Sequence, residues 1–404
     1  MGKPTIRFKG YTDDWEQRKL GDIYGSIGNA FVGTATPYYA EQGHFYLESN
    51  NVKDGQINHN SEIFINDEFY EKQKDKWLHT GDMVMVQSGH VGHAAVIPEE
   101  LDNTAAHALI MFRNPKEEIE PYFLNYEYQT DKTKRKIENI TTGNTIKHIL
   151  ASDMQEFIVD VPKYEEQKEI AGYFCSLDYL ITLHQCKCDQ AKILKKYMLQ
   201  KMFPQNDEKV PKIRFKSFTD DWEQRKLGEL GTVQTCKRIF KEQTSEQGDI
   251  PFFKNGTIGL EPDSYISREV YEEFRRLYPY PEVGDTLISV VGSIGRTAEY
   301  AGKDEYFQDS NVVWLKTDGS INKKFLKISY QVIKWLIEGS TVKHLYNNNI
   351  LRSEIVMPVS QIEQAKIAEF FEALDHLITL HQHKCEELKN IKKFMLQNMF
   401  VQEK

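Results

Sequence analysis

Long apolar runs are missing from this sequence. No stretch approaches the roughly 20 consecutive apolar residues that a membrane-spanning helix needs, and the N-terminal stretch MGKPTIRFKG lacks the apolar core of a secretory signal. Cysteine is also scarce: five among 404 residues. Such an odd and sparse set argues against a disulfide framework and fits a reducing compartment. We therefore expect a cytoplasmic protein.

Motifs of self-contained catalysis are missing too. The chain has no G-x-x-x-x-G-K-[ST] loop for a nucleotide phosphate, no Asn/Asp-Pro-Pro-aromatic tetrapeptide of amino-methyltransferases, and no G-x-G-x-x-G after a strand. Its glycine patterns at Gly25–Gly33 and Gly292–Arg296 are more typical of turns. We therefore expect a non-catalytic protein without a cofactor of its own.

An excess of basic residues is missing as well. The formal net charge is −9 at pH 7 and the isoelectric point is about 5.8, whereas nucleic-acid-binding proteins usually carry a basic footprint. This balance counts against nucleic-acid binding by the chain as a whole, but it leaves room for local basic surfaces and basic partner subunits. The length suggests two or three domains.

What the chain does contain is two pairs of repeated segments. TDDWEQRKLG occurs at Thr12–Gly21 and again, about half a chain later, at Thr219–Gly228. The second pair, Glu166–Phe203 and Glu363–Phe400, shares the pattern EQ…I…F…LD…ITLHQ…K…MLQ.MF. Apart from Gly172, neither copy contains a residue strong enough to stop a helix, so each predicts one long helix of about 38 residues.

A seam of similar residues runs along both predicted helices. At alternating four- and three-residue steps the positions are apolar at both ends and polar in the middle, as in a coiled coil. They are Ile170, Phe174, Leu177, Ile181, His184, Cys188, Ala191, Lys195, Met198 and Met202, then Ile367, Phe371, Leu374, Ile378, His381, Cys385, Leu388, Lys392, Met395 and Met399. We expect the two helices to pair with each other.

The polar middle of the seam has two interpretations. His184, Cys188, His381 and Cys385 have the composition of a His₂Cys₂ zinc site if the midpoints of an antiparallel pair meet. The same residues also suit a polar layer that fixes the register of a coiled coil. We expect the polar layer, and no metal.

Two variable stretches, roughly 24–160 and 231–355, share landmarks in the same order. Each has a Gly-Asp turn, a strand and a tight G-x-x-G turn, in GDMVMVQSGHVG and in GDTLISVVGSIG. Predicted helices at Glu120–Ile137 and Asn322–Gly339 follow, and then a strand that leads into the long helix. We expect α+β globular units at 1–160 and 208–357, followed by long-helix segments at 161–207 and 358–404.

This order of elements resembles that of type I restriction–modification specificity subunits. The resemblance covers essentially the whole chain and rests on the duplicated WEQRKLG openings, the GD…SG/GS…G turns, the G-x-T-[IV]-K-H segments and the two long helices. It implies two globular α/β target recognition domains separated by an antiparallel coiled coil, with a pseudo-twofold repeat. Each domain would read one half of a bipartite, asymmetric site in double-stranded DNA.

The resemblance also implies partners. In the family, two modification subunits carry S-adenosylmethionine and the adenine methylation chemistry, and restriction subunits join them to form the cleaving complex. This chain would choose the DNA sequence and do no chemistry.

Candidates for DNA contact come from basic stretches and from polar tips beside the G-x-x-G turns. Lysine and arginine suit phosphates, and Arg296 suits a guanine edge. The candidates are Ser88, His90, His93, Lys134, Arg135 and Lys147 in the first unit, and Lys237, Arg238, Ser293, Arg296, Lys343 and Asn348 in the second. Each has a plain alternative: a solvated face for the basic stretches, a hairpin without ligand for the turns, and a cap for Asn347–Asn349.

A different class of function fits the sequence as well. A tandem scaffold that binds proteins or peptides through its two units, without DNA, agrees with the acidic balance. Salt-dependent, sequence-selective duplex binding separates the two hypotheses. Trp15 and Trp222 raise the same choice locally, because they suit either a core anchor or a protein interface.

Overall fold

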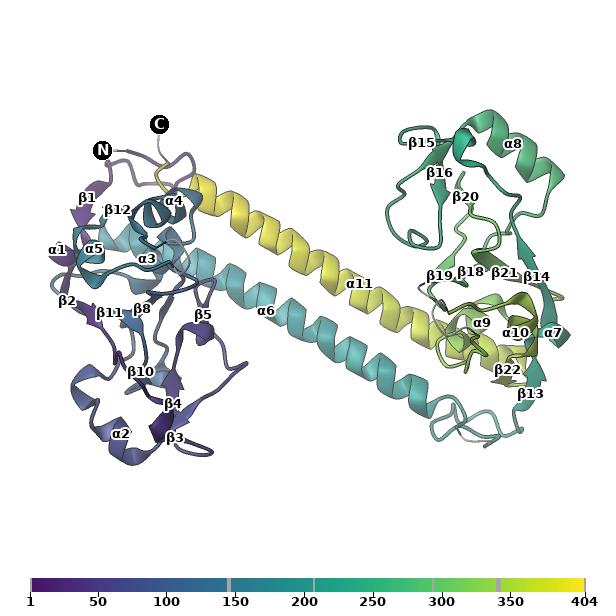
Figure 1. The fold of residues 1–404 in the computed structure, drawn as a ribbon, viewed down its shortest axis with the longest axis horizontal. Coiled ribbons are helices and arrows are strands. Elements are labelled where there is room, and N and C mark those ends of the chain that lie inside the picture. The colour runs from purple at the N-terminus through teal and green to yellow at the C-terminus, as the bar shows by residue number, and fades with distance from the viewer. Residues whose placement is uncertain (1, 144–146, 206–207, 293, 339–342, 403–404) are drawn as a thin grey trace. The chain divides into compact units, whose positions relative to one another are not determined.

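The computed structural model describes residues 2–143, 147–205, 208–292, 294–338 and 343–402 (Figure 1). The chain divides into two compact units: the first contains residues 1–185 and 382–404, and the second contains residues 186–381. Two long helices, α6 (Tyr164–Lys201) and α11 (Gln361–Asn398), contribute to both units. Each unit therefore combines a globular α+β part with a portion of each long helix.

The globular part of the first unit is built on two four-stranded sheets. The larger has the order β2-β11-β8-β9, all antiparallel, at Tyr24–Asn29, Leu109–Pro115, Met83–Val86 and Ala94–Val96. The smaller has the order β10-β4-β7-β3, at Ala105–Ala106, His44–Leu47, Phe64–Ile65 and Tyr39–Ala40. A short pair, β5 (Val52–Lys53) and β6 (Gln56–Ile57), and the helices α1 (Leu20–Ile23), α2 (Asp67–Glu71), α3 (Pro121–Glu127), α4 (Asp131–Ile140) and α5 (Ala151–Glu156) complete it.

The run MVMV in β8 is apolar throughout because both faces of its sheet are covered. Met83 and Met85 belong to the core that includes the long helices, whereas Val84 and Val86 belong to a second core on the opposite face. Alternate side chains of a strand point to opposite faces, so a strand buried on both sides needs apolar residues at every position.

The second unit repeats this topology. Its sheets have the orders β14-β21-β18-β19, at Gly231–Thr235, Val312–Thr317, Thr286–Ser289 and Thr297–Glu299, and β15-β17-β16-β20, at Thr244–Ser245, Tyr265–Ile266, Ile250–Phe253 and Tyr306–Phe307. Its shorter helices are α7 (Leu227–Leu230), α8 (Arg268–Leu277), α9 (Lys323–Ser329) and α10 (Asn347–Arg352). The internal repeat predicted from the sequence is therefore confirmed at the level of strand order.

The repeated opening segment forms the same substructure in both units. In the first, β1 (Glu16–Lys19) pairs antiparallel with β12 (Ile158–Val161), the strand that leads into α6. In the second, β13 (Glu223–Lys226) pairs in the same way with β22 (Glu354–Met357), which leads into α11. The segment is written twice because each copy ties the start of a globular part to the base of a long helix.

Each opening segment also places one tryptophan in a core. Trp15 is fully buried and makes edge contacts with Phe123 and Phe400, at ring-centroid distances of 5.5 and 6.0 Å. Trp222 makes the equivalent contact with Phe203 at 5.9 Å. The end of α11 thus completes the first core as the end of α6 completes the second. Both tryptophans are core anchors, and neither presents its ring on an exposed surface.

A buried ion pair fastens each opening segment to a long helix. The guanidinium of Arg7 donates to both carboxylate oxygens of Glu166, at 2.6 and 2.7 Å, and to the backbone carbonyl of Asp13 at 2.6 Å. Arg214 makes the same bidentate contact with Glu363, at 2.7 and 2.9 Å. The hydrogen bonds to Glu166 raise the pKa of Arg7 above its ordinary value.

The two long helices pack antiparallel within each unit. In the first unit, Lys392 Nζ lies 2.7 and 2.9 Å from the carboxylate oxygens of Asp178. In the second, Lys195 Nζ lies 2.6 Å from Asp375 Oδ1. Every position of the predicted seam is buried or half-buried, so the seam is confirmed. Among the described residues, no helix is both long enough and apolar enough to cross a membrane.

Two shorter helices differ from prediction. The single helix expected at Glu120–Ile137 is two, α3 and α4, and the one expected at Asn322–Gly339 ends at Ser329, as α9, within the described residues. The side chain of Thr130 accepts a hydrogen bond from the backbone N–H of Thr133 and so starts α4. Val332 occupies the equivalent position in the second unit and has no oxygen to cap a following helix.

One buried carboxyl of the first unit is expected to make its stability pH-dependent. Burial raises the pKa of Glu127 to about 8, whereas an unfolded chain has the ordinary value of about 4.3. The folded state then binds more protons between these values, so the free energy of unfolding falls as pH rises, by about 1.4 kcal/mol for each pH unit at most. We expect Glu127→Gln to flatten this fall in denaturant titrations at pH 5, 7 and 9. Parallel curves for the two proteins would contradict the assignment.

Candidate nucleic-acid interface

The G-x-x-G turn of the first unit connects β8 to β9. The Gly92 N–H donates to the carbonyl of Val86 at 3.0 Å, and Val86 N–H donates to the carbonyl of His93 at 2.8 Å. Gly92 has a φ of 89°, and a Cβ at this position would lie 2.9 Å from Ile137 Cγ2 on α4. Glycine is therefore required twice over, for its backbone angle and for the close packing of the turn against the helix.

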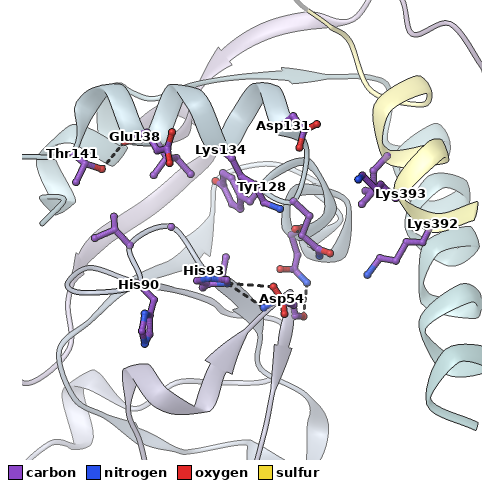
Figure 2. A pocket seen from close by; sticks show the side chains of 18 of the residues that line it. Asp54, His90, His93, Tyr128, Asp131, Lys134, Glu138, Thr141, Lys392 and Lys393 are labelled. Carbon is purple, nitrogen blue, oxygen red and sulfur yellow. Dashed lines mark hydrogen bonds and ion pairs between the residues drawn. The ribbon is translucent and has the colours of Figure 1, made fainter. Parts of the chain in front are cut away.

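A cavity of about 600 Å³ opens beside this turn (Figure 2). All of its lining residues belong to the first unit. They come from the G-x-x-G turn and the start of β9, from the turn between β5 and β6, from α3, α4 and the following segment, and from the last turns of α11. The basic side chains among them are His90, His93, Lys134, Lys147, Lys389, Lys392 and Lys393. The acidic side chains are Asp54, Asp131 and Glu138. Four of the six candidates predicted for this unit therefore line one cavity.

His93 is a neutral hydrogen-bonding group. Its Nδ1 accepts a hydrogen bond from the backbone N–H of Asp54 at 3.2 Å, as Figure 2 shows. Partial burial lowers the pKa of the ring, and the Asp54 carboxylate, 3.7 Å from Nδ1, opposes that effect less strongly. The ring is therefore largely neutral at pH 7, and its Nε2–H is left as a donor. His90 is exposed at the tip of the same turn.

The other two candidates of the first unit do not line the cavity. Ser88 is half-buried and pairs through its backbone with His148. Arg135 is exposed, and its Nε donates to the carbonyl of Asp131, 3.2 Å away on the preceding turn of α4. Each is close in sequence to residues of the cavity but is not part of its lining.

The second unit has an equivalent turn between β18 and β19 with a different tip. Gly295 N–H donates to the carbonyl of Ser289 at 3.0 Å, and Ser289 N–H to that of Arg296 at 2.9 Å. Arg296 Nη1 donates to the carbonyl of Gly256 at 2.8 Å. Ser293 lies outside the described residues. Arginine thus stands in the second unit where histidine stands in the first.

The remaining candidates of the second unit are Lys237, Arg238, Lys343 and Asn348. Arg238 forms an ion pair with Asp309, Nε to Oδ2 at 3.0 Å, and Lys237 Nζ lies 4.8 Å from the centre of the Tyr278 ring. Lys343 is exposed, and so is Asn348, on α10. That Lys237, Lys343 and Asn348 touch DNA stays a prediction, as it does for every candidate.

One of the three asparagines at Asn347–Asn349 has a structural role. Asn349 is buried, and its Nδ2 donates to the carbonyl of Leu336 at 2.8 Å and to Glu338 Oε1 at 2.9 Å. This bonding holds the loop after α9 against α10. Among these three residues, the exposed side chains of Asn347 and Asn348 are the ones a ligand can reach.

The sequence-based candidate set omitted Lys389 and Lys393. Both are exposed on α11 and line the cavity, yet in the sequence they look like ordinary charges on the outside of a coiled coil. The available signal was the repeat itself: Lys389, Lys392 and Lys393 recur in α6 as Lys192, Lys195 and Lys196.

The histidines and cysteines at the middle of the helices do not form a recognisable metal site. Within the described residues, no three His, Cys, Asp or Glu side chains are grouped so as to hold a metal ion. In the second unit Cys188 Sγ lies 3.9 Å from the carbonyl of Ile378, and in the first unit Cys385 Sγ lies 4.0 Å from that of Ile181. Both thiols are buried against the partner helix, which agrees with a packed layer.

Comparison with known proteins establishes the family. A model of the type I restriction modification DNA specificity domain matches residues 12–192 and, a second time, residues 219–390. The chain belongs to this family. It is a type I restriction–modification specificity subunit with two target recognition units, and the α+β fold class with its internal repeat and long helices is as predicted.

Several specificity subunits are similar over most of their length. A putative one from Haemophilus influenzae is 34% identical over 270 residues, which cover 66% of this chain and 68% of that protein. The putative MjaX specificity subunit of Methanocaldococcus jannaschii is 24% identical over 406 residues, 94% of this chain and 91% of that one. The crystal structure of the S subunit from M. genitalium superimposes over the whole of both chains with a TM-score of 0.67 at 15% identity, which shows a shared fold.

Proposed function

We propose that this chain reads a bipartite, asymmetric site in double-stranded DNA, with one half-site for each recognition unit, and that it docks two modification subunits. Those subunits supply the methylation chemistry, restriction subunits join them for cleavage, and the chain itself is non-catalytic. The complex acts on DNA in the cytoplasm. The observation that supports this proposal is a pair of equivalent G-x-x-G turns, one in each unit, that share their backbone framework but differ in their side chains.

The backbone frameworks of the two turns match in detail. Both G-x-x-G turns are closed by equivalent backbone hydrogen bonds, Val86 N–H to His93 in the first unit and Ser289 N–H to Arg296 in the second. Both are bridged to the segment after them, through His148 and His344. The tips differ in sequence, because His90 and His93 of the first unit correspond to Ser293 and Arg296 of the second. Because histidine and arginine offer different hydrogen-bond patterns to base edges, the two half-sites are expected to differ.

Duplex binding tests this function against the protein scaffold. The purified complex of this chain with its modification subunit is titrated with duplexes carrying intact or scrambled target, between 50 and 200 mM salt. We expect tighter binding to the intact target, and affinities that fall steeply with salt for both. Equal, salt-independent, weak binding would favour the scaffold. The chain alone, given the methyl donor, is expected to methylate nothing.

An apolar stripe beside the seam is the proposed docking surface. It lies one residue before seam positions in both helices. Its members are Leu180, Ile391 and Phe394 in the first unit, and Leu194, Tyr197, Leu377 and Leu380 in the second. They are exposed, apart from the half-buried Ile391. In an antiparallel pair, residues one position before the seam lie on the same side of both helices. Each unit therefore presents a shared apolar face of the kind that a partner helix covers.

Glutamate in this face is expected to weaken docking. Phe394 is 58% exposed and its repeat equivalent, Tyr197, is 49% exposed. We expect Phe394→Glu combined with Tyr197→Glu to weaken binding of the modification subunit at least tenfold, because an apolar contact would have to bury two carboxylates. Isothermal titration with the purified modification subunit measures this. Phe240→Glu, at a residue 59% exposed and off the helices, is the matched control and should leave the affinity unchanged.

A further inference from the structure

We propose that the lysines of the two long helices bind the DNA backbone beside each half-site: Lys389 and Lys393 in the first unit, with Lys134 and Lys147, and Lys192 and Lys196 in the second. The inference rests on the proposed function and adds a division of labour to it. The shared helices hold phosphates, and the variable turns read bases.

The charge of the cavity comes from lysines without internal partners. Among the described residues, no carboxylate lies within ion-pair distance of Lys134, Lys147, Lys389 or Lys393, whereas Lys392 is neutralised by Asp178. These four lysines are exposed. Three carboxylates also line the cavity, but none of them forms an ion pair with these four ammonium groups, which are therefore available to an anionic ligand. Lysine on its flexible stem suits phosphate as a point charge.

These lysines lie beside the G-x-x-G turn, which is the part of the unit proposed to read bases. The same cavity is lined by Gly89, His90 and Gly92 of the turn, and the Gly89 N–H donates to the carbonyl of Lys147 at 3.2 Å. Figure 2 shows the turn with His90 and His93 on one side of the cavity, and Lys392 and Lys393 of α11 on the other. DNA whose bases meet the turn therefore brings its backbone within reach of the helix.

The repeat supports the same role in the second unit. Lys192 and Lys196 of α6 are exposed, and Lys195 between them pairs with Asp375 as Lys392 pairs with Asp178. Lys195 and Lys392 have a structural reason to recur in both helices, because each forms an ion pair with the other helix. Lys196, Lys389 and Lys393 form no such pair among the described residues, and Lys192 has only an exposed ion pair on its own helix, with Asp189 Oδ1 at 3.6 Å. The outer faces of the two helices differ at most other positions. A shared need for backbone contacts explains their recurrence.

Phosphate contacts position a protein on DNA without carrying sequence information. Placing them on the repeated helices lets the variable turns change the base sequence that is read without loss of the electrostatic anchor. It also answers the objection from the net charge of −9, because a local basic surface is enough for this purpose.

The test uses the complex of this chain with its modification subunit, and duplexes carrying intact or scrambled target. The variants are Lys389→Gln with Lys393→Gln, and separately Lys192→Gln with Lys196→Gln, since glutamine keeps helix propensity and removes charge. The control is Lys168→Gln, an exposed lysine of α6 in the first unit that does not line the cavity and is not repeated in α11, where Ala365 stands at that position. Dissociation constants are measured from 50 to 200 mM salt, with complex assembly checked by native mass spectrometry.

We expect each double variant to lose about 5–10-fold in affinity per lysine near 0.1 M salt, equally for both duplexes, and to reduce the slope of log affinity against log salt by about 0.9 per contact. The methylated sequence should not change. Unchanged affinity and slope, with normal target binding by the unsubstituted complex, would overturn the inference and leave the proposed function standing. Loss confined to the intact target would make these lysines base readers, and loss of assembly would place them in a subunit interface; either result overturns the inference. Failure of the unsubstituted complex to prefer its target would instead remove the proposed function.

Discussion

Replacing Arg7 with alanine is expected to lower the free energy of unfolding of the first unit by about 3–5 kcal/mol. Its partner Glu166 is 1% exposed and accepts two charge-assisted hydrogen bonds from the guanidinium. Removal of the arginine leaves an uncompensated carboxylate in the core, which costs far more than the loss of a surface ion pair. The opening strand β1 then loses its tie to α6.

Hydrogen exchange with mass spectrometry measures this effect unit by unit. In the Arg7→Ala protein, amides of β1 and β12 should exchange faster while those of the second unit stay protected, and Arg214→Ala should give the mirror result. Lys19→Ala is the control, because its ion pair with Glu156 has both side chains at least half exposed, and solvent and salt screen such a pair so that it contributes little to stability. Equal effects of Arg7→Ala and Lys19→Ala would show that the buried ion pair does not stabilise the attachment of the opening segment to α6.

Insertion of one helical turn in both long helices is expected to lengthen the gap in the DNA target and to leave both half-sequences unchanged. We propose that the length of the helix pair sets the gap between the half-sites, so one extra turn adds about 5.4 Å, or between one and two base pairs. Methylation at the original target should disappear. It should reappear at a site with the same two half-sequences and a longer gap.

The control for this change is an insertion of equal length in a loop. Residues Glu246–Gly248 are exposed and lie between β15 and β16, so an insertion there should leave the gap unaltered. If the helix-insertion protein methylates sites with the original gap, the length of the helices does not set the gap between the half-sites.

The frame of the fold could be predicted because its signals are local and repeated. The seam of α6 and α11 follows from side chains at four- and three-residue steps, and all of the predicted positions are covered in the structure. The Gly-Asp and G-x-x-G turns bracket β8 and β18 as expected, since turns that require positive φ favour glycine.

The departures from prediction come from single residues and from contacts distant in sequence. A cap at Thr130 starts α4, whereas Val332 at the equivalent position offers no cap, and within the described residues no counterpart of α4 follows α9. Burial of Trp15 depends on Phe400, at the far end of the chain, and no local pattern shows that contact.

The site was predicted in part for the same reason. His90, His93, Lys134 and Lys147 are close in sequence to landmarks of the first unit, and the structure gathers them at one cavity. Lys389 and Lys393 reach that cavity only because the end of α11 returns to the first unit. Arg135 carried the same sequence signal as Lys134, one residue away, but the helix turns its side chain to another face.

The most direct test of the central claim is genome-wide mapping of adenine methylation by single-molecule sequencing, in a host that makes this chain with its modification subunit. The account predicts a new methylated motif with two unlike halves and a fixed gap, absent from the host without the chain. A continuous or symmetric motif would contradict the reading of one half-site by each unit. No new methylation, with both proteins soluble and associated, would contradict the proposal that the chain directs modification.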